Sequence, residues 1–429
     1  MELSASFGQR LLWLLQRSVG RSGALNCPVI LRLRGRLDEG LLRAALASLV
    51  ARHEALRTTF TGAGHQLTQV VHDPVPPEWE IDDVRGAAEV DRRLADELAQ
   101  QVDFADWPTR TRLWRVADDE HVLCLTMHHL VTDAWSCGLL YRELTETLAR
   151  LGAGAAAPDP PRWQYADFTR WQYDFFDSTA AGRYRAFWTR QLTGLQLPAV
   201  PMTPRARQRQ RITDIARRDI PAGVTDGLAR LAKAERTTLF AVLLAAYYAA
   251  LHRRTGQDDL AMTSLFANRG QREVAGTVGF VANMVVLRCA VPPRATFTEL
   301  VRRAATTARE AFLHERLPYQ LLPIPTANTG TQRADDVVFQ MLGEPITVSA
   351  RAAGLEISGI VPQGVARFDL ELAVIPHGRG LQVQVFYACD RLDPVWAEAL
   401  ADDYLAVVGA VADRPDLPLP ALPALATRE

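Results

Sequence analysis

The sequence predicts an α/β protein built of two lobes of similar size. Three observations predict this class. The chain has 429 residues, which is more than a single hydrophobic core commonly holds. Segments with helix and strand periodicity are mixed along both halves. A helical, aromatic-rich stretch near residue 175 separates the halves, so we expect an N-terminal lobe over residues 1–175 and a C-terminal lobe over residues 176–429.

The first lobe contains the clearest strand and helix patterns. PVILRLRGRL (28–37) alternates apolar and polar residues, as a half-buried strand does. Asp38 precedes the helical pattern EGLLRAALASLVARHE, and we expect its side chain to cap that helix. RLWRVA (112–117) and HVLCLTMHH (121–129) are predicted strands that flank an acidic turn. A helix over about 135–151 follows.

A loop and a helical bridge lead into the second lobe. LGAGAAAPDPPR (151–162) is rich in small residues and proline, which favours a loop. The bridge is a pair of aromatic-rich helices, WQYADFTRWQYDFF and AAGRYRAFWTRQL. The second half has strand candidates in RITDIARRDI, LAMTSLFA, NMVVLRCAV, VVFQML, FDLELAVI and LQVQVFYA. Its helix candidates are VTDGLARLAKAE, LFAVLLAAYYAALHRR, FTELVRRAATTAREAFLH and PVWAEALADDYLAVVGAVA.

Composition excludes several classes of protein. Net charge is -1, so no overall field favours nucleic acid or an anionic membrane. The longest apolar run, LFAVLLAAYYAAL (239–251), is too short to span a bilayer and is expected to be a buried helix. The N-terminus lacks the features of a signal peptide. The five cysteines include no CxxC pair, which is typical of reduced thiols. We expect a cytoplasmic monomer.

The sharpest local pattern is MHHLVTDAWS (127–136), at the end of an apolar strand. A strand end allows His129 to project into a cleft, and Asp133 follows four residues later. Two other interpretations exist: a histidine pair that only packs, and a metal site. No third ligand and no HExxH-like pattern lies nearby, which disfavours metal.

The same residues begin a series of family motifs. MHHLVTDAWS resembles the HHxxxDG motif of condensation domains in nonribosomal peptide synthesis, with Ala134 in place of the usual glycine. Other segments are similar to further motifs of that family, in the family's order: SFGQRLLWL (6–14), RHEALRTTF (52–60), YADFTRW (165–171), VGFVANMVVLR (278–288), HERLPYQ (314–320) and ARFDLEL (366–372). The chain therefore resembles a condensation domain over nearly its whole length.

This resemblance implies a fold and a reaction. The fold would be two chloramphenicol acetyltransferase-like lobes arranged as a V, with the active site in a tunnel between them. The reaction would join a carrier-bound acyl thioester to an amine. Donor and acceptor peptidyl carrier proteins would present both substrates on 4'-phosphopantetheine arms, and no tightly bound cofactor or metal would be needed.

Chemistry assigns roles to the two histidines. A thiolate is a good leaving group, so no covalent acyl-enzyme is required. A neutral imidazole can accept the proton of the attacking amine or orient it, and its reference pKa of about 6.5 keeps it mostly neutral in the cytosol. We expect His129 to have this role. His128 is expected to support the fold or the ring orientation of His129.

The resemblance also implies partners for Asp133. This carboxylate would turn inward to an arginine as a structural ion pair, with Arg52 or Arg57 as candidates. Trp135 and Ser136 begin the next helix, where exposed N–H groups would suit a developing oxyanion or the phosphopantetheine arm.

Three nearby residues have alternative interpretations. Ala134 is strained if the usual glycine needs a positive φ, and fits if only a small side chain is needed. Asn283 either contacts the pantetheine amide or is a turn residue. Cys137 lies close to the motif, but a helix position alone is weak evidence for a nucleophile, so we expect it to pack.

Related activities are distinguished by their motifs. Epimerisation domains continue with a Ser-Trp-Arg run, whereas DAWSCGLL follows here. Heterocyclisation domains carry DxxxxD, and plant-type acyltransferases carry DFGWG; neither pattern is found. An ester-forming relative would use the same histidine. A degenerate platform that recruits carrier proteins or tailoring oxidases is the non-enzymatic alternative, and it is disfavoured because both histidines are kept.

Overall fold

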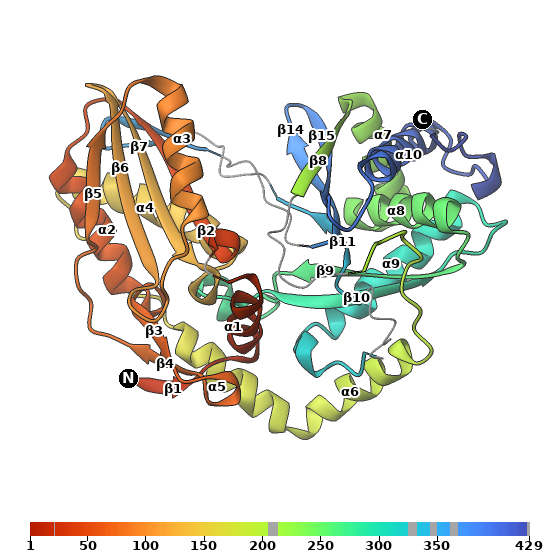
Figure 1. Ribbon diagram of the computed structural model, residues 1–429, viewed down its shortest axis with the longest axis horizontal. Coiled ribbons are helices and arrows are strands. Elements are labelled where there is room, and N and C mark those ends of the chain that lie inside the picture. Colours follow the sequence, from red (N-terminus) through yellow and green to blue (C-terminus); the bar gives the residue numbers. More distant parts are fainter. Residues whose placement is uncertain (21, 205–212, 325–332, 344–349, 361–367, 427–429) are drawn as a thin grey trace. The chain divides into compact units, whose positions relative to one another are not determined.

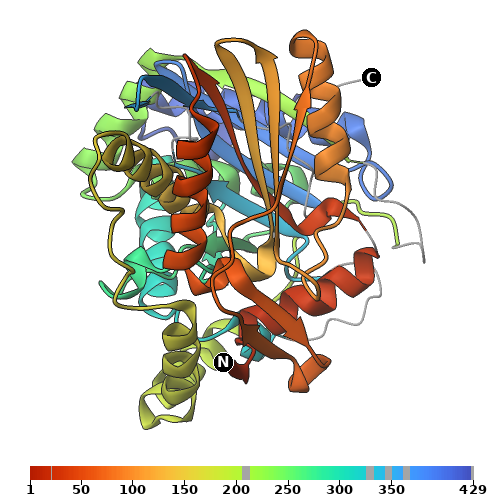
Figure 2. The same cartoon turned by 90° about the vertical axis from the view of Figure 1, so that its left-hand side faces the viewer.

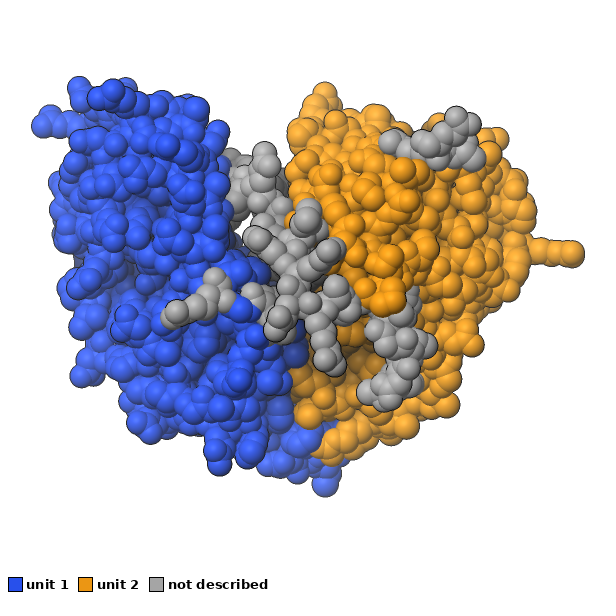
Figure 3. Space-filling model, in the orientation of Figure 1, with its two compact units in different colours: residues 1–181, 267–282, 345–363 blue, residues 182–266, 283–344, 364–429 orange. Residues whose placement is uncertain are grey.

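The computed structural model describes residues 1–20, 22–204, 213–324, 333–343, 350–360 and 368–426. The chain divides into two compact units (Figure 3). Unit 1 comprises 1–181, 267–282 and 345–363, and unit 2 comprises 182–266, 283–344 and 364–429. The division therefore falls after Ala181 rather than after residue 175. Two segments of the second half also return to unit 1, which a prediction of two uninterrupted lobes did not include.

Unit 1 contains a mixed sheet of six strands in the order β12-β13-β2-β7-β6-β5 (Figure 1). Neighbouring strands are antiparallel except β5 and β6. Their bounds are Ala350–Ala352, Leu355–Gly359, Asn26–Arg34, Glu120–His128, Thr109–Ala117 and Trp79–Asp83. A small sheet, β1-β4-β3, adds Glu2–Ser4, Thr68–Val71 and Thr58–Thr61.

Helices cover both faces of the six-stranded sheet. Odd-numbered residues of β2 pack with α2 (Glu39–Arg52) and α4 (Ala134–Gly152), whereas Ile30 packs on the other face with α3 (Gly86–Ala99). Figure 2 shows this sheet between its helices. The side chain of Asp38 accepts from Leu41 N–H at 2.9 Å, which confirms it as the cap of α2. Helices α1 (Phe7–Val19) and α5 (Tyr165–Asp177) complete unit 1.

Unit 2 is built on a second six-stranded sheet in the order β10-β9-β11-β14-β15-β8 (Figure 1). Strand β11 runs parallel to both neighbours, and the other pairs are antiparallel. The bounds are Asn283–Ala290, Asp259–Phe266, Val337–Met341, Leu370–His377, Gly380–Ala388 and Thr213–Ile220. Residues 211–212 and 366–367, which belong to predicted segments, lie outside the described residues.

Five helices accompany this sheet, and α8 confirms the predicted buried helix. Its residues 241–251 are all buried, because the apolar run covers every side of the helix rather than one stripe. The helices are α6 (Thr179–Leu192), α7 (Ala222–Ala234), α8 (Leu239–Thr255), α9 (Phe297–Leu313) and α10 (Pro394–Asp413). Within the described parts of the chain, no helix has both the length and the apolar content needed to cross a membrane.

Candidate active site

The histidine motif forms a turn between a central strand and a helix of unit 1. Strand β7 ends at His128, the chain continues through a short 3-10 helix over His129–Val131, and α4 begins at Ala134. We call residues 128–136 the 128–136 turn. Because β7 lies between β2 and β6 in the sheet, the start of this turn is anchored on both sides.

His128 is locked as a neutral, buried ring. Its Nδ1 accepts from Leu130 N–H at 3.1 Å, so its proton lies on Nε2, which donates to Gln16 Oε1 at 3.1 Å. Burial, and secondarily the neighbouring His129, lower the pKa of His128 to about 3. These contacts fit the supporting role predicted for it, because both ring nitrogens already have partners within the fold.

His129 has the opposite arrangement of its ring nitrogens. Its Nδ1 lies 2.7 Å from the carbonyl oxygen of Thr132. A carbonyl only accepts, so Nδ1 carries a proton and, in the neutral ring, Nε2 carries the lone pair. This is the tautomer that a general base needs, and the bond also fixes the plane of the ring.

Phe280 borders the His129 ring. The two ring centroids are 5.4 Å apart and the planes are nearly perpendicular, at 85°. Two contacts fix Phe280: Tyr165 Oη donates to its carbonyl oxygen at 2.7 Å, and α1 approaches its ring at Gly8. A Cβ atom at Gly8 would lie 2.8 Å from Phe280 Cδ1, so glycine leaves the room that this ring occupies.

Asp133 is a buried carboxylate whose oxygens all have donors. As the cap of α4, its Oδ1 accepts from Ser136 N–H at 2.8 Å. Its Oδ2 accepts from the N–H groups of Val281 and Ala282, both at 3.1 Å. Nη2 of Arg269 donates to the two oxygens at 3.0 and 3.1 Å. Asp133 therefore joins the 128–136 turn to the 267–282 segment.

The predicted partners of Asp133 were wrong, because neither Arg52 nor Arg57 contacts it. Arg52 Nε donates to Glu143 at 2.8 Å, and Arg57 Nε donates to the carbonyl of Val50 at 3.3 Å. The RHEALRTTF stretch lies at the end of α2, where α4 and nearby backbone satisfy its arginines. Sequence reasoning missed Arg269, although it follows an apolar strand just as His129 does.

Ser136 and Trp135 also bind the 267–282 segment. Ser136 Oγ donates to the carbonyl of Gly279 at 3.0 Å and accepts from Gly279 N–H at 3.1 Å and Arg269 Nη2 at 2.9 Å. Trp135 Nε1 donates to the carbonyl of Ala275 at 3.0 Å, although the residue remains 46% exposed. The described bonds of both side chains are internal, so their predicted contact with phosphopantetheine is untested.

Ala134 fits the turn without backbone strain. It is the first residue of α4, and it is not among the described non-glycine residues with positive φ. The interpretation in which Ala134 is strained is therefore wrong. The Asp133 side chain caps Ser136 N–H, whereas the N–H groups of Ala134 and Trp135 have no acceptor among the described residues.

Asn283 and Cys137 have structural surroundings. In unit 2, Asn283 Nδ2 donates to the carbonyls of Glu315 and Leu317 at 2.6 and 2.8 Å, and its Oδ1 accepts from Tyr319 N–H at 3.1 Å. Cys137 is buried with its Sγ 3.4 Å from Cys27, and this contact together with burial raises the pKa of its thiol well above normal. The packing role predicted for Cys137 agrees with this. No group of three or more potential metal ligands occurs among the described residues.

Comparisons with known proteins agree with the sequence motifs. The family model described as "Condensation domain" matches residues 1–429. Chondramide synthase of Chondromyces crocatus is 38% identical over 330 residues, which are 74% of the chain and 8% of the synthase. Part of the linear gramicidin synthase of Brevibacillus parabrevis is 32% identical over 444 residues, covering 100% of the chain and 9% of that synthase polypeptide. The chain spans less than a tenth of either polypeptide.

A solved structure gives the same result for the fold. The X-domain in its complex with OxyB from teicoplanin biosynthesis is 28% identical, with a TM-score of 0.85. The match covers 98% of this chain and 95% of the X-domain chain. The family resemblance and the chloramphenicol acetyltransferase-like fold class predicted from the sequence are thereby confirmed.

Proposed function

The chain belongs to the condensation domain family, and from this membership and the geometry of His129 we propose that it joins a carrier-bound acyl group to an amine. The amine nitrogen attacks the thioester carbonyl, a C–N bond forms and the C–S bond breaks. The amine proton moves to Nε2 of His129 and then to the leaving thiolate. The products are an amide and a free phosphopantetheine thiol.

The Nδ1–Thr132 bond is the observation that carries this proposal. It fixes the ring so that the basic nitrogen in the neutral form is Nε2. A positioned base of this kind contributes about 10²–10⁴-fold to a rate. Because Nε2 of His128 is committed to Gln16, the two histidines have different roles: one is a catalytic residue and the other is a positioning residue.

The oxyanion that forms at the thioester carbonyl needs donors. We assign the N–H groups of Ala134 and Trp135, which lie at the start of α4. The helix dipole adds a partial positive charge there. Asp133 keeps this helix start in place through its cap and its ion pair with Arg269. Donor and acceptor peptidyl carrier proteins supply the two substrates on 4'-phosphopantetheine arms.

The test is a reconstitution with candidate carrier proteins, followed by measurement of the mass of each loaded arm. The parent protein should transfer the acyl group from the donor arm to the amine on the acceptor arm. His129→Ala should reduce the rate by about 10²–10⁴-fold and remain folded. His65→Ala, which changes an exposed histidine in the same unit, is the matched control. Parental turnover by folded His129→Ala would exclude the assigned chemistry.

A second candidate function is a platform that binds carrier proteins without catalysis. The observation that favours it is the likeness to the X-domain, whose solved complex contains OxyB. The reconstitution separates the two functions, because a platform would bind a loaded carrier protein and leave its arm unchanged.

A further inference from the structure

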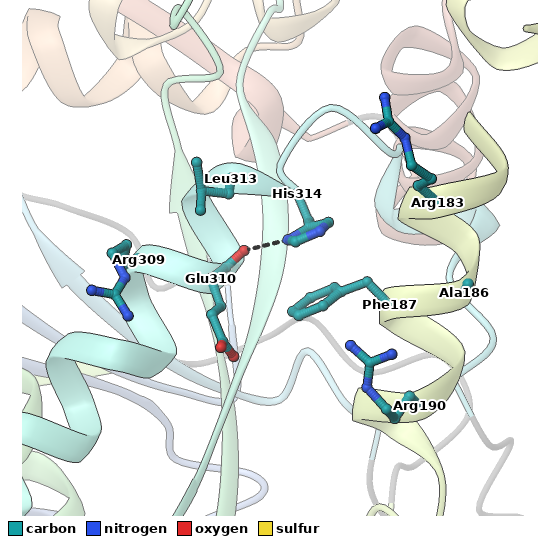
Figure 4. A pocket seen from close by; sticks show the side chains of 8 residues that line it. All are labelled: Arg183, Ala186, Phe187, Arg190, Arg309, Glu310, Leu313 and His314. Carbon is teal, nitrogen blue, oxygen red and sulfur yellow. Dashed lines mark hydrogen bonds between the residues drawn. The ribbon is translucent and has the colours of Figure 1, made fainter. Parts of the chain in front are cut away.

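The motif HERLPYQ (314–320) has no part in the proposed chemistry, yet it borders a cavity of unit 2. His314 follows α9 directly, and a cavity of about 460 Å³ lies between α9 and α6 (Figure 4). On α6 the lining residues Arg183, Phe187 and Arg190 recur at the spacing of one helix face. Everything that lines the cavity therefore belongs to one unit.

Aromatic contacts hold the two helices together at the base of this cavity. The Phe187 ring stacks on the His314 ring, with centroids 3.7 Å apart and planes 5° from parallel. Trp188 Nε1, which is buried, donates to the carbonyl of His314 at 3.1 Å. Figure 4 shows the side chains of Phe187 and His314 directed toward each other across the cavity. The spacing of α6 and α9 is therefore fixed by the protein itself.

The rim of the cavity is positively charged. Arg183, Arg190 and Arg309 are exposed, and none of them has a carboxylate partner among the described residues. Other arginines of unit 2 do have partners: Arg288 pairs with Asp259 at 2.6 Å, and Arg302 with Glu235 at 2.6 Å. The lining includes only one acidic side chain, on α9, so the site has excess positive charge in a chain of net charge -1.

An exposed apolar pair lies beside this rim. Phe312 is 53% exposed and Leu313 is 58% exposed, and Leu313 also lines the cavity. Adjacent large apolar side chains in water, next to arginines, are typical of the centre and edge of a protein interface. Because the charged residues here are cations, the complementary partner carries carboxylates around an apolar patch.

We propose that this surface, formed by Arg183, Phe187, Arg190, Arg309, Phe312 and Leu313 and here named the α6–α9 surface, docks a carrier-protein domain through an acidic, apolar-centred face. The inference rests on the proposed function, because substrates tethered to a carrier protein require that the enzyme bind the carrier as well as the arm. The arginines steer the acidic carrier, and Leu313 fills its apolar patch.

The experiment compares tethered and untethered substrates. Initial rates are measured against the concentration of each loaded carrier protein in turn, and again with the same acyl group on free pantetheine. Arg183→Glu/Arg190→Glu/Arg309→Glu should raise the KM for one carrier by about tenfold or more, and weaken its dependence on salt. Leu313→Ala should raise the same KM by about fivefold. Rates with pantetheine thioesters should stay within about twofold of the parent.

Arg230→Glu, on the exposed side of α7 in the same unit, is the matched charge control. Unchanged KM values for both carriers in the folded variants would overturn the docking proposal. So would equal losses with pantetheine thioesters, or an equal effect of Arg230→Glu. A parent protein that forms no amide with carriers or with pantetheine thioesters would instead exclude the proposed function, and the docking proposal with it.

Discussion

Asp133 and Arg269 of unit 1 are buried and bind each other, whereas Arg183, Arg190 and Arg309 of unit 2 are exposed and have no carboxylate partner among the described residues. The 128–136 turn keeps its charges inside the fold, where they hold a catalytic ring in place. The α6–α9 surface leaves its charges in water, where they are accessible to another molecule. Buried charge of this kind gives rigidity, and exposed charge gives recognition.

The largest expected effect breaks the buried side of this comparison. Asp133→Ala leaves Arg269 buried without its carboxylate and removes the cap of α4, so the free energy of unfolding should fall by about 3–5 kcal/mol. Arg309→Ala, on the α6–α9 surface, should change it by less than about 0.5 kcal/mol. Urea unfolding of both variants measures the difference. Equal stabilities would mean that the Asp133–Arg269 pair does not hold the turn.

A second effect concerns the neutral ring of His128. Its pKa in the folded protein is about 3, below the value of about 6.5 in the unfolded chain. The unfolded state therefore binds a proton first, and the stability that this ring contributes is lost as pH falls from about 6.5 toward 3. The loss should be about 2 kcal/mol between pH 6.5 and pH 5.

Urea unfolding at several pH values checks this prediction. His128→Gln should have a shallower pH dependence than the parent over that range, and His65→Ala should retain the parental slope. A parental slope in His128→Gln would show that His128 is not the group responsible.

A smaller effect sharpens the account of how His129 is positioned. Phe280→Leu removes the aromatic edge beside the imidazole and keeps most of the apolar volume, so stability should fall by less than about 1.5 kcal/mol. The rate of amide formation should fall about tenfold, because the basic nitrogen is less well aligned, while the KM for each carrier stays the same. A changed KM with an unchanged turnover rate would indicate instead that Phe280 contacts substrate.

The smallest effect is expected at Ala134. Because this residue begins α4 without a positive φ, Ala134→Gly should cost up to about 1 kcal/mol in helix propensity and packing and leave the His129 ring in place. Rates with a small and a bulky amine acceptor should be retained, with a relative gain for the bulky one if the methyl group faces the substrate. A loss of more than about a hundredfold with both acceptors would mean that Ala134 positions the site actively.

Local patterns predicted the elements of the fold but not all of their places. The helix that begins after Asp38 and the buried helix over 239–255 both follow from side-chain spacing and caps. Strand β13, however, pairs with β2 in unit 1, with Glu356 opposite Arg34. No periodicity within 355–359 indicates a destination more than three hundred residues earlier in the chain, because pairing partners depend on tertiary packing.

The same limit applied to the site. His129 and Asp133 lie within one short motif, so spacing alone placed them together. Arg269 comes from a segment 136 residues away from Asp133, and the nearer arginines Arg52 and Arg57 have other partners. Which arginine enters a buried pair is decided by how the 267–282 segment folds onto unit 1, and this information is not contained in the motif.

The most direct test of the central claim is the protonation of the His129 ring. The account requires that Nδ1 carry the proton and donate it to Thr132, leaving Nε2 as the base. ¹⁵N NMR of the protein with labelled histidine, assigned by comparison with His129→Ala, reports which ring nitrogen is protonated. At a pH where the ring is neutral, the account predicts a protonated Nδ1 and an unprotonated Nε2. A protonated Nε2 would contradict it.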